Sequence, residues 1–212
     1  MDEGFWHRRW RKNEISFHKD QPNALMVEHF KGAFATEGGR VLVPLCGKTR
    51  DIGWLLAQGC RIAGAELSQL AVDQLFADLG MTPEAADLGP ITRCSAAGID
   101  IFVGNILDLS AAMLGPVDVT YDRAALVALP EAMREGYAAH LVRLTEAAPQ
   151  FLITFEYDQT RMPGPPFSVT GDDIRRLYGA RYGLTLLAST EVVGGLKGQC
   201  PATEQAWLLR PA

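Results

Sequence analysis

One stretch near residue 40 constrains the fold more than any other part of the chain. Residues 41–51 read Val-Leu-Val-Pro-Leu-Cys-Gly-Lys-Thr-Arg-Asp, and apolar residues then recur with helical spacing at Ile52, Leu55 and Leu56. An apolar β-branched run that breaks at Pro and Gly and resumes with helical spacing predicts a buried strand, a tight turn and a helix. The next apolar run ends in Glu66 and predicts a second strand. We therefore expect the cofactor-binding corner of an open α/β sheet.

The spacing within this corner separates three kinds of ligand. A dinucleotide fingerprint needs G-x-G-x-x-G, and only Gly47 is present. A P-loop shares the ending of residues 47–49 but needs a glycine where this chain has Leu42. A carboxylate at the second strand end, Glu66, can accept hydrogen bonds from both ribose hydroxyls and needs no phosphate site. This arrangement implies S-adenosylmethionine; the alternative is an exposed strand-end acid without a ligand.

Composition limits the remaining function classes. A chain of 212 residues suits one domain. The net charge of −5 gives nucleic acid little reason to bind. The cysteines form no C-x-x-C pair, and with the histidines they show no metal-ligand spacing. Few cysteines indicate a reducing cytoplasm, and no apolar run suggests a signal peptide or a membrane span. We expect a soluble, cytoplasmic monomer without a metal.

Five motifs, in order along nearly the whole chain, resemble the thiopurine S-methyltransferase family of Rossmann-like methyltransferases. They are Trp10 with Ser-Phe-His at 16–18, Val-Pro-Leu-Cys-Gly-Lys at 43–48, Gly-Ala-Glu-Leu-Ser at 64–68, Asp-Arg-Ala-Ala-Leu-Val-Ala at 122–128 and Pro-Gly-Pro-Pro-Phe at 163–167. The resemblance implies a seven-stranded, mostly parallel sheet with helices on both faces. It also implies one methyltransferase domain over 1–212, with an N-terminal helical lid over 1–35 and a core over 36–212.

Hydrophobic periodicity and turn residues give the other elements. Short strands are expected at 91–93 and 99–104 as a hairpin, and further strands at 117–121, 151–155, 184–190 and 204–209. Helices are expected over 24–30, 69–79 with Ser68 as cap, 130–144, and from Thr170 to Arg181. Residues 81–90 are expected to form a loop with at most a short helical turn.

Residues 5–12 interleave aromatic and basic side chains. Alone, this pattern fits a membrane-surface or nucleic-acid arm, or an amphipathic helix that caps the core. The resemblance implies a third role, a lid that holds Trp10 against the cofactor. A ring beside a sulfonium gains roughly 0.5–2 kcal/mol by cation–π attraction. Family analogy also puts Phe17 near the acceptor, although a single aromatic residue can equally belong to the core.

The other predicted site residues follow the strand ends. By resemblance, Asn105 hydrogen-bonds the adenine and Ile106 packs on its face; the alternative for Asn105 is a turn residue bonded to backbone. Leu45 is also a predicted cofactor contact. Arg123 is predicted to bind the cofactor and the acceptor charge, because its planar fork suits a carboxylate or an anionic acceptor. The role of Lys197 stays open.

The resulting hypothesis is methyl transfer from S-adenosylmethionine to a small aromatic or heterocyclic thiol. The pKa of such thiols is lower than the reference pKa of a cysteine thiol, about 8.5. The acceptor can therefore arrive as thiolate and needs no general base. Family analogy adds selenium and tellurium compounds, and residues 163–167 would shape the acceptor pocket. Two alternatives remain: an oxygen or nitrogen methyltransferase, for which His18 is a loosely placed base, and a non-catalytic module that only binds the cofactor.

Overall fold

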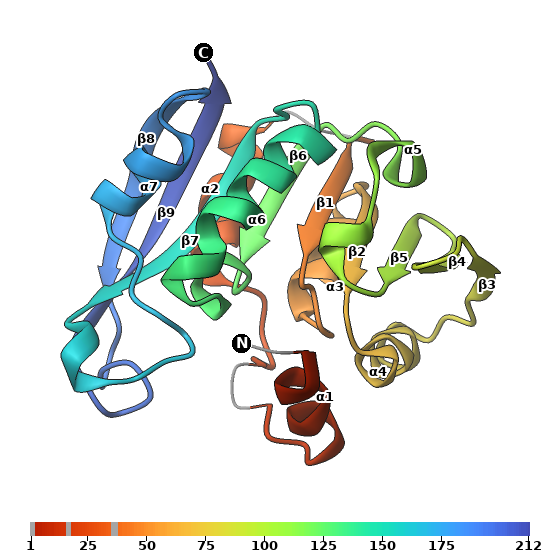
Figure 1. The fold of residues 1–212 in the computed structure, drawn as a ribbon, viewed down its shortest axis with the longest axis horizontal. Coiled ribbons are helices and arrows are strands. Elements are labelled where there is room, and N and C mark those ends of the chain that lie inside the picture. The colour runs from red at the N-terminus through yellow and green to blue at the C-terminus, as the bar shows by residue number, and fades with distance from the viewer. Residues whose placement is uncertain (1–2, 16–17, 35–37) are drawn as a thin grey trace. The chain divides into compact units, whose positions relative to one another are not determined.

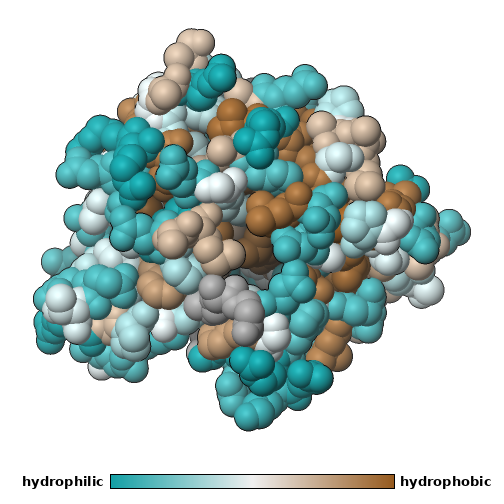
Figure 2. Space-filling model, viewed as in Figure 1, coloured by the Kyte–Doolittle hydropathy of each residue, from teal (hydrophilic) through white to brown (hydrophobic). Residues whose placement is uncertain are grey.

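The computed structural model describes residues 3–15, 18–34 and 38–212, and it contains two compact units, residues 1–119 and residues 120–212. In Figure 1 the first unit runs from red to green and the second from green to blue. Hydrophilic residues cover most of the face drawn in Figure 2, and hydrophobic residues show between them. No helix in the described ranges is long and apolar enough to cross a membrane.

The described part of the first unit contains five strands in the order β3-β4-β5-β2-β1. Their bounds are β1 (Arg40–Pro44), β2 (Arg61–Glu66), β3 (Glu84–Asp87), β4 (Thr92–Ala96) and β5 (Ile99–Val103). β2 is parallel to both β1 and β5, whereas β4 is antiparallel to β5 and β3 to β4. β1 and β2 are almost entirely buried, as expected for central strands covered on both faces.

Capping residues mark the ends of several helices in the first unit. They are α1 (Glu3–Arg11), α2 (Ala24–Ala33), α3 (Arg50–Ala57), α4 (Gln69–Leu79), α5 (Ala111–Leu114) and the 3₁₀ turn η1 (Ile106–Asp108). The hydroxyl of Thr49 caps α3, and α4 ends at Gly80 with a left-handed φ of 66°. Ser68 holds the N-cap position of α4, but its side chain makes no capping hydrogen bond. The position of the predicted cap is therefore confirmed, but the hydrogen bond expected from its hydroxyl is not formed.

The second unit contains four strands in its described residues, in the order β6-β7-β9-β8. Its elements are β6 (Val119–Arg123), η2 (Leu126–Ala128), α6 (Glu131–Leu144), β7 (Gln150–Tyr157), η3 (Gln159–Arg161), α7 (Gly171–Tyr178), β8 (Tyr182–Glu191) and β9 (Ala202–Pro211). β6 and β7 are parallel, and the other two pairs are antiparallel. α6 and α7 contact each other on one face of this sheet (Figure 1).

The predicted α/β class is confirmed, with two differences in detail. The described residues form nine strands rather than seven, and the pairs within the units are mixed rather than mostly parallel. β3 was expected to be loop, because an exposed edge strand with the sequence Glu-Ala-Ala-Asp carries no apolar alternation. α7 ends at Tyr178 rather than Arg181, because the chain turns at Gly179 to enter β8.

Candidate functional site

Glu66 closes the corner that the sequence singles out. It is the last residue of β2 and is only 6% exposed, so it is not an exposed strand-end acid. Its Oε2 accepts a hydrogen bond from the N–H of Gly47 (2.8 Å), and its Oε1 accepts one from the N–H of Ser68 (2.8 Å). The carboxylate therefore ties the β1–α3 turn to the start of α4.

The electrostatics of Glu66 reflect a balance of two causes. Burial raises the pKa of its carboxyl, and the N–H groups of Ser68, Gly47 and Leu67 oppose that rise. An ionised carboxylate has about four acceptor positions, so these bonds leave room for further donors. The arrangement can accept hydroxyl groups from a ligand without moving the turn that it holds.

The turn before Glu66 has an unusual backbone. Leu45 has φ of 48° and Gly47 has φ of 51°, both in the left-handed region. A bulky residue in this region costs on the order of 1–3 kcal/mol, and such conformations cluster at functional sites. The N–H of Cys46 donates to the carbonyl of Ala65 (3.0 Å), which continues the pairing of β1 with β2 past Pro44. The strain at Leu45 is thus held by the adjoining strand.

Helix α1 lies against this turn in the first unit. Trp10 is 4% exposed, and its Cζ2 lies 3.1 Å from the position that a Cβ on Gly47 would occupy. A Cβ at this position would require the ring to shift by a few tenths of an ångström, so the glycine lets Trp10 lie this close to the turn. Glu3, at the start of α1, accepts a hydrogen bond at Oε1 from Nδ2 of Asn105 (2.9 Å). α1 is therefore attached both to the β1–α3 turn and to the loop after β5.

Asn105 and Ile106 follow β5, the neighbour of β2. The N–H of Gly104 donates to the backbone carbonyl of Glu66 (2.9 Å), so the two strand ends adjoin. Oδ1 of Asn105 accepts the N–H of Leu107 (3.0 Å), which makes it the cap of η1. The turn role foreseen as the alternative is present, while adenine binding by Asn105 and Ile106 stays a prediction.

Asp122 and Arg123 end β6 in the second unit and differ sharply. Asp122 is fully buried; its Oδ1 accepts the N–H of Leu126 (3.1 Å) and its Oδ2 accepts the hydroxyl of Tyr137 (2.8 Å). Burial raises the pKa of this carboxyl to about 6. Asp122 therefore ties the turn after β6 to α6. Arg123 is half-buried, and within the described ranges its guanidinium makes no hydrogen bond or ion pair.

The proline-rich segment, residues 163–167, is held by side chains from elsewhere in the second unit. The hydroxyl of Tyr157 donates to the carbonyl of Pro166 (2.7 Å). The ammonium of Lys197 donates to the carbonyl of Pro165 (2.7 Å). Sequence reasoning left Lys197 without a role, because its partner is a backbone carbonyl 32 residues away. The loop is therefore fixed rather than merely stiffened by its prolines.

The two remaining candidates lie near the N-terminus. Phe17 falls outside the described residues, so its predicted place near the acceptor stays a prediction. Burial lowers the pKa of His18, and the positive charges of Lys48 and Arg50 add to this effect. Its imidazole is therefore neutral at pH 7 and able to take a proton. These two cations were not singled out from the sequence; both lie within 4 Å of the carboxylate of Asp78.

The chain is similar in sequence to known proteins over nearly its whole length. A family model described as thiopurine S-methyltransferase matches residues 1–205. The chain is 55% identical to a thiopurine S-methyltransferase of Xanthobacter autotrophicus, with 100% of both chains covered. It is 48% identical to one of Gluconobacter oxydans, covering 98% of this chain and 94% of that protein.

Solved structures agree on the architecture. A Burkholderia thailandensis 1,6-didemethyltoxoflavin-N1-methyltransferase with bound S-adenosylhomocysteine has a TM-score of 0.65 at 16% identity, covering 99% of this chain and 87% of that one. A TehB-like S-adenosylmethionine-dependent methyltransferase of Corynebacterium glutamicum has a TM-score of 0.57 at 16% identity, covering 99% and 98%. At this identity the similarity establishes the fold alone.

Proposed function

The chain belongs to the thiopurine S-methyltransferase family, and we propose that it methylates the sulfur of thiopurines and related aromatic or heterocyclic thiols. Membership makes it a methyltransferase that uses S-adenosylmethionine; the thiol acceptor is the proposal. The observation that carries the proposal is the 55% identity, over the full length of both chains, to a protein named for this activity.

The residues of the first unit fit the methyl donor. The buried carboxylate of Glu66 offers acceptor positions at the end of β2, and we propose that it binds the ribose hydroxyls. The turn that it holds has no glycine-rich phosphate cradle, as a donor without phosphate requires. Trp10 would face the sulfonium, Leu45 would contact the donor, and Asn105 with Ile106 would hold the adenine. Asn105 would have to share its amide between Glu3 and the base.

The chemistry asks little of the protein beyond position. When bound, the donor supplies an electrophilic methyl group on a sulfonium. A thiolate acceptor arrives already charged, so the chain needs to orient it in line with the methyl and to exclude water. Arg123 makes no side-chain contact that competes for its guanidinium in the described ranges, and we propose that it binds negative charge on the acceptor or the donor carboxylate.

The test is incubation with labelled donor and either 6-mercaptopurine or a catechol. We expect label on the sulfur of 6-mercaptopurine and none on the catechol. Methylation of the catechol alone would favour an oxygen methyltransferase, for which the neutral imidazole of His18 is the base to examine. Donor binding without transfer to either compound would favour a binding module. An aromatic selenol in the same assay tests the wider acceptor range.

A further inference from the structure

Arg134, in the first turn of α6, is a buried cation with unused donors. It is only 4% exposed, and burial lowers its pKa. Its Nε donates to the carbonyl of Leu129 (3.0 Å), and no other hydrogen bond of this side chain occurs within the described ranges. Neither Nη nitrogen is among the fully enclosed polar atoms that lack a partner, so their N–H groups face accessible space. A buried cation is stable only when it is paired or hydrogen-bonded.

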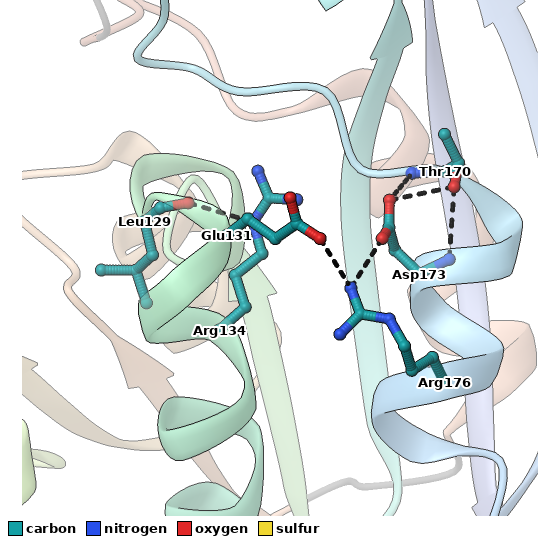
Figure 3. A network of polar contacts seen from close by, with 6 residues as sticks. All are labelled: Leu129, Glu131, Arg134, Thr170, Asp173 and Arg176. Atoms are coloured by element: carbon teal, nitrogen blue, oxygen red, sulfur yellow. Dashed lines mark hydrogen bonds and ion pairs between the residues drawn. The ribbon is translucent and has the colours of Figure 1, made fainter.

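The two carboxylates that act on the charge of Arg134 are engaged by another cation. Glu131 and Asp173 both act on its charge, yet neither is joined to it by an ion pair in the described residues. Figure 3 shows both carboxylates directed to Arg176 instead, at 3.4 Å and 2.9 Å. The second oxygen of Asp173 accepts from the N–H and the hydroxyl of Thr170 (both 2.9 Å). The protein thus supplies charge near Arg134 without filling its donors.

One face of the guanidinium is covered by Phe167, the last residue of the proline-rich segment. The guanidinium carbon lies 5.9 Å from the centre of the Phe167 ring. The N–H of Phe167 donates to the carbonyl of Val127 (2.6 Å), which fixes the segment at this end. Because the donors of a guanidinium lie in its own plane, contact with a ring face uses none of them. The edge of Arg134 stays open while its orientation is set.

We propose that Arg134 and Phe167 form a subsite for a planar anion, in which Nη1 and Nη2 bind the negative charge and the ring of Phe167 packs against the bound aromatic system. A planar fork suits a carboxylate or a charge spread over a heteroaromatic ring. The inference rests on the proposed function in one respect, since it takes the anion to be the acceptor. It makes Arg134 a specificity residue in addition to Arg123.

The experiment compares two ring-matched probes that cannot be methylated on sulfur. Calorimetry measures the affinity of indole-5-carboxylate and of indole, without donor, for the wild type and for R134Q, R134K and R175Q. We expect the wild type to prefer the carboxylate about tenfold or more, the effect of one charge-assisted hydrogen bond. R134Q should lose this preference and R134K should retain only part of it. R175Q is the matched control and should keep it, because Arg175 is exposed and pairs with Asp172, so its loss leaves Glu131 and Asp173 bound to Arg176.

Two outcomes of these binding measurements would contradict the proposed subsite. A wild type that binds both probes alike, or an R134Q variant that keeps the full preference, would overturn the inference. Thermal melting shows whether R134Q is folded. If it is not, R134K decides, and an unchanged affinity of R134K for the carboxylate would overturn the inference. In the methyl-transfer assay R134Q should raise the KM for 6-mercaptopurine about tenfold with little change in kcat. If the wild type prefers indole-5-carboxylate to indole but transfers no methyl group, the proposed function is wrong and the subsite is still supported.

Discussion

Each unit of the molecule has a buried carboxylate in the last residues of a parallel strand, Glu66 in β2 and Asp122 in β6. Both have a raised pKa because of burial. Glu66 bonds backbone N–H groups on two separate turns, whereas Asp122 bonds the turn that follows it and one hydroxyl from α6. Glu66 joins the β1–α3 turn to the start of α4, and Asp122 joins the turn after β6 to α6.

The contrast shows that burial and a raised pKa do not by themselves identify a ligand-binding acid. Asp122 has no exposed surface, while Glu66 keeps 6%. The bonds of Glu66 to Gly47 and Ser68 come from backbone N–H groups of two turns, whereas Asp122 also takes the hydroxyl of a buried side chain, Tyr137. We therefore expect ligand effects from changes at Glu66 and stability effects from changes at Asp122.

The largest expected effect is the pH dependence that Asp122 contributes. Its folded pKa of about 6 exceeds the ordinary value of 3.8, so between these values the folded state binds more protons than the unfolded state. The free energy of unfolding therefore falls as pH rises from about 4 to 6, by about 3 kcal/mol, and this contribution is flat above that range. Urea unfolding of the wild type and of Asp122→Asn, from pH 4 to 8, measures it.

The raised pKa of Glu66 acts in the same direction, but it is present in both proteins and cancels in the comparison. The stability of the wild type relative to Asp122→Asn should therefore decline over this window. A constant difference would show that Asp122 does not titrate there, and a rising one would mean that its folded pKa is depressed.

The next effect is on donor affinity at Glu66. Glu66→Gln places an amide nitrogen where one carboxylate oxygen accepts an N–H, and it removes the charge. Donor binding should weaken by about 1.5–3 kcal/mol, the range for hydrogen bonds to a charged group. Calorimetry with S-adenosylhomocysteine measures this change. Equal weakening in Asp122→Asn would erase the distinction between the two acids.

The sequence predicted the Glu66 corner well because its signals are local. The apolar run to Pro44, the turn at Gly47 and the acid at the end of the next run are all read from neighbours along the chain. The burial of Glu66 and its hydrogen bonds to Gly47 and Ser68 could not be predicted from the sequence, since they depend on how β1 and β2 pair. β3 was missed because an exposed edge strand needs no apolar pattern.

Fewer side-chain contacts of the second unit could be predicted from the sequence, because they too depend on how separate segments pack. Arg134 was not singled out at all, because in a helix sequence an arginine is normally a solvated residue. Its significance comes from contacts with Leu129 and Phe167, which lie on separate segments. The bond from Lys197 to Pro165 likewise has no sequence signature. Motifs revealed which segments matter, and only packing revealed which side chains hold them.

A smaller effect on stability, with a clear effect on turnover, is expected at Arg123. Arg123→Gln removes a guanidinium that makes no hydrogen bond or ion pair in the described ranges, so the free energy of unfolding should change by no more than about 0.5 kcal/mol. The value of kcat/KM for 6-mercaptopurine should fall about tenfold or more. Normal turnover would remove Arg123 from the site, and a large loss of stability would make it structural like its neighbour Asp122.

The smallest effect concerns the attachment of α1 on the Glu66 side. The hydrogen bond between Glu3 and Asn105 is exposed, and one such bond contributes about 0.5–1.5 kcal/mol at most. If α1 acts as a lid, Glu3→Ala should speed release of S-adenosylhomocysteine by a few-fold and leave global stability almost unchanged. Stopped-flow measurement of the single variants and of the double variant with Asn105→Ala forms a cycle that isolates the bond. Strictly additive changes would mean that the two residues act on release separately, and that Trp10 at Gly47, rather than this bond, keeps α1 in place.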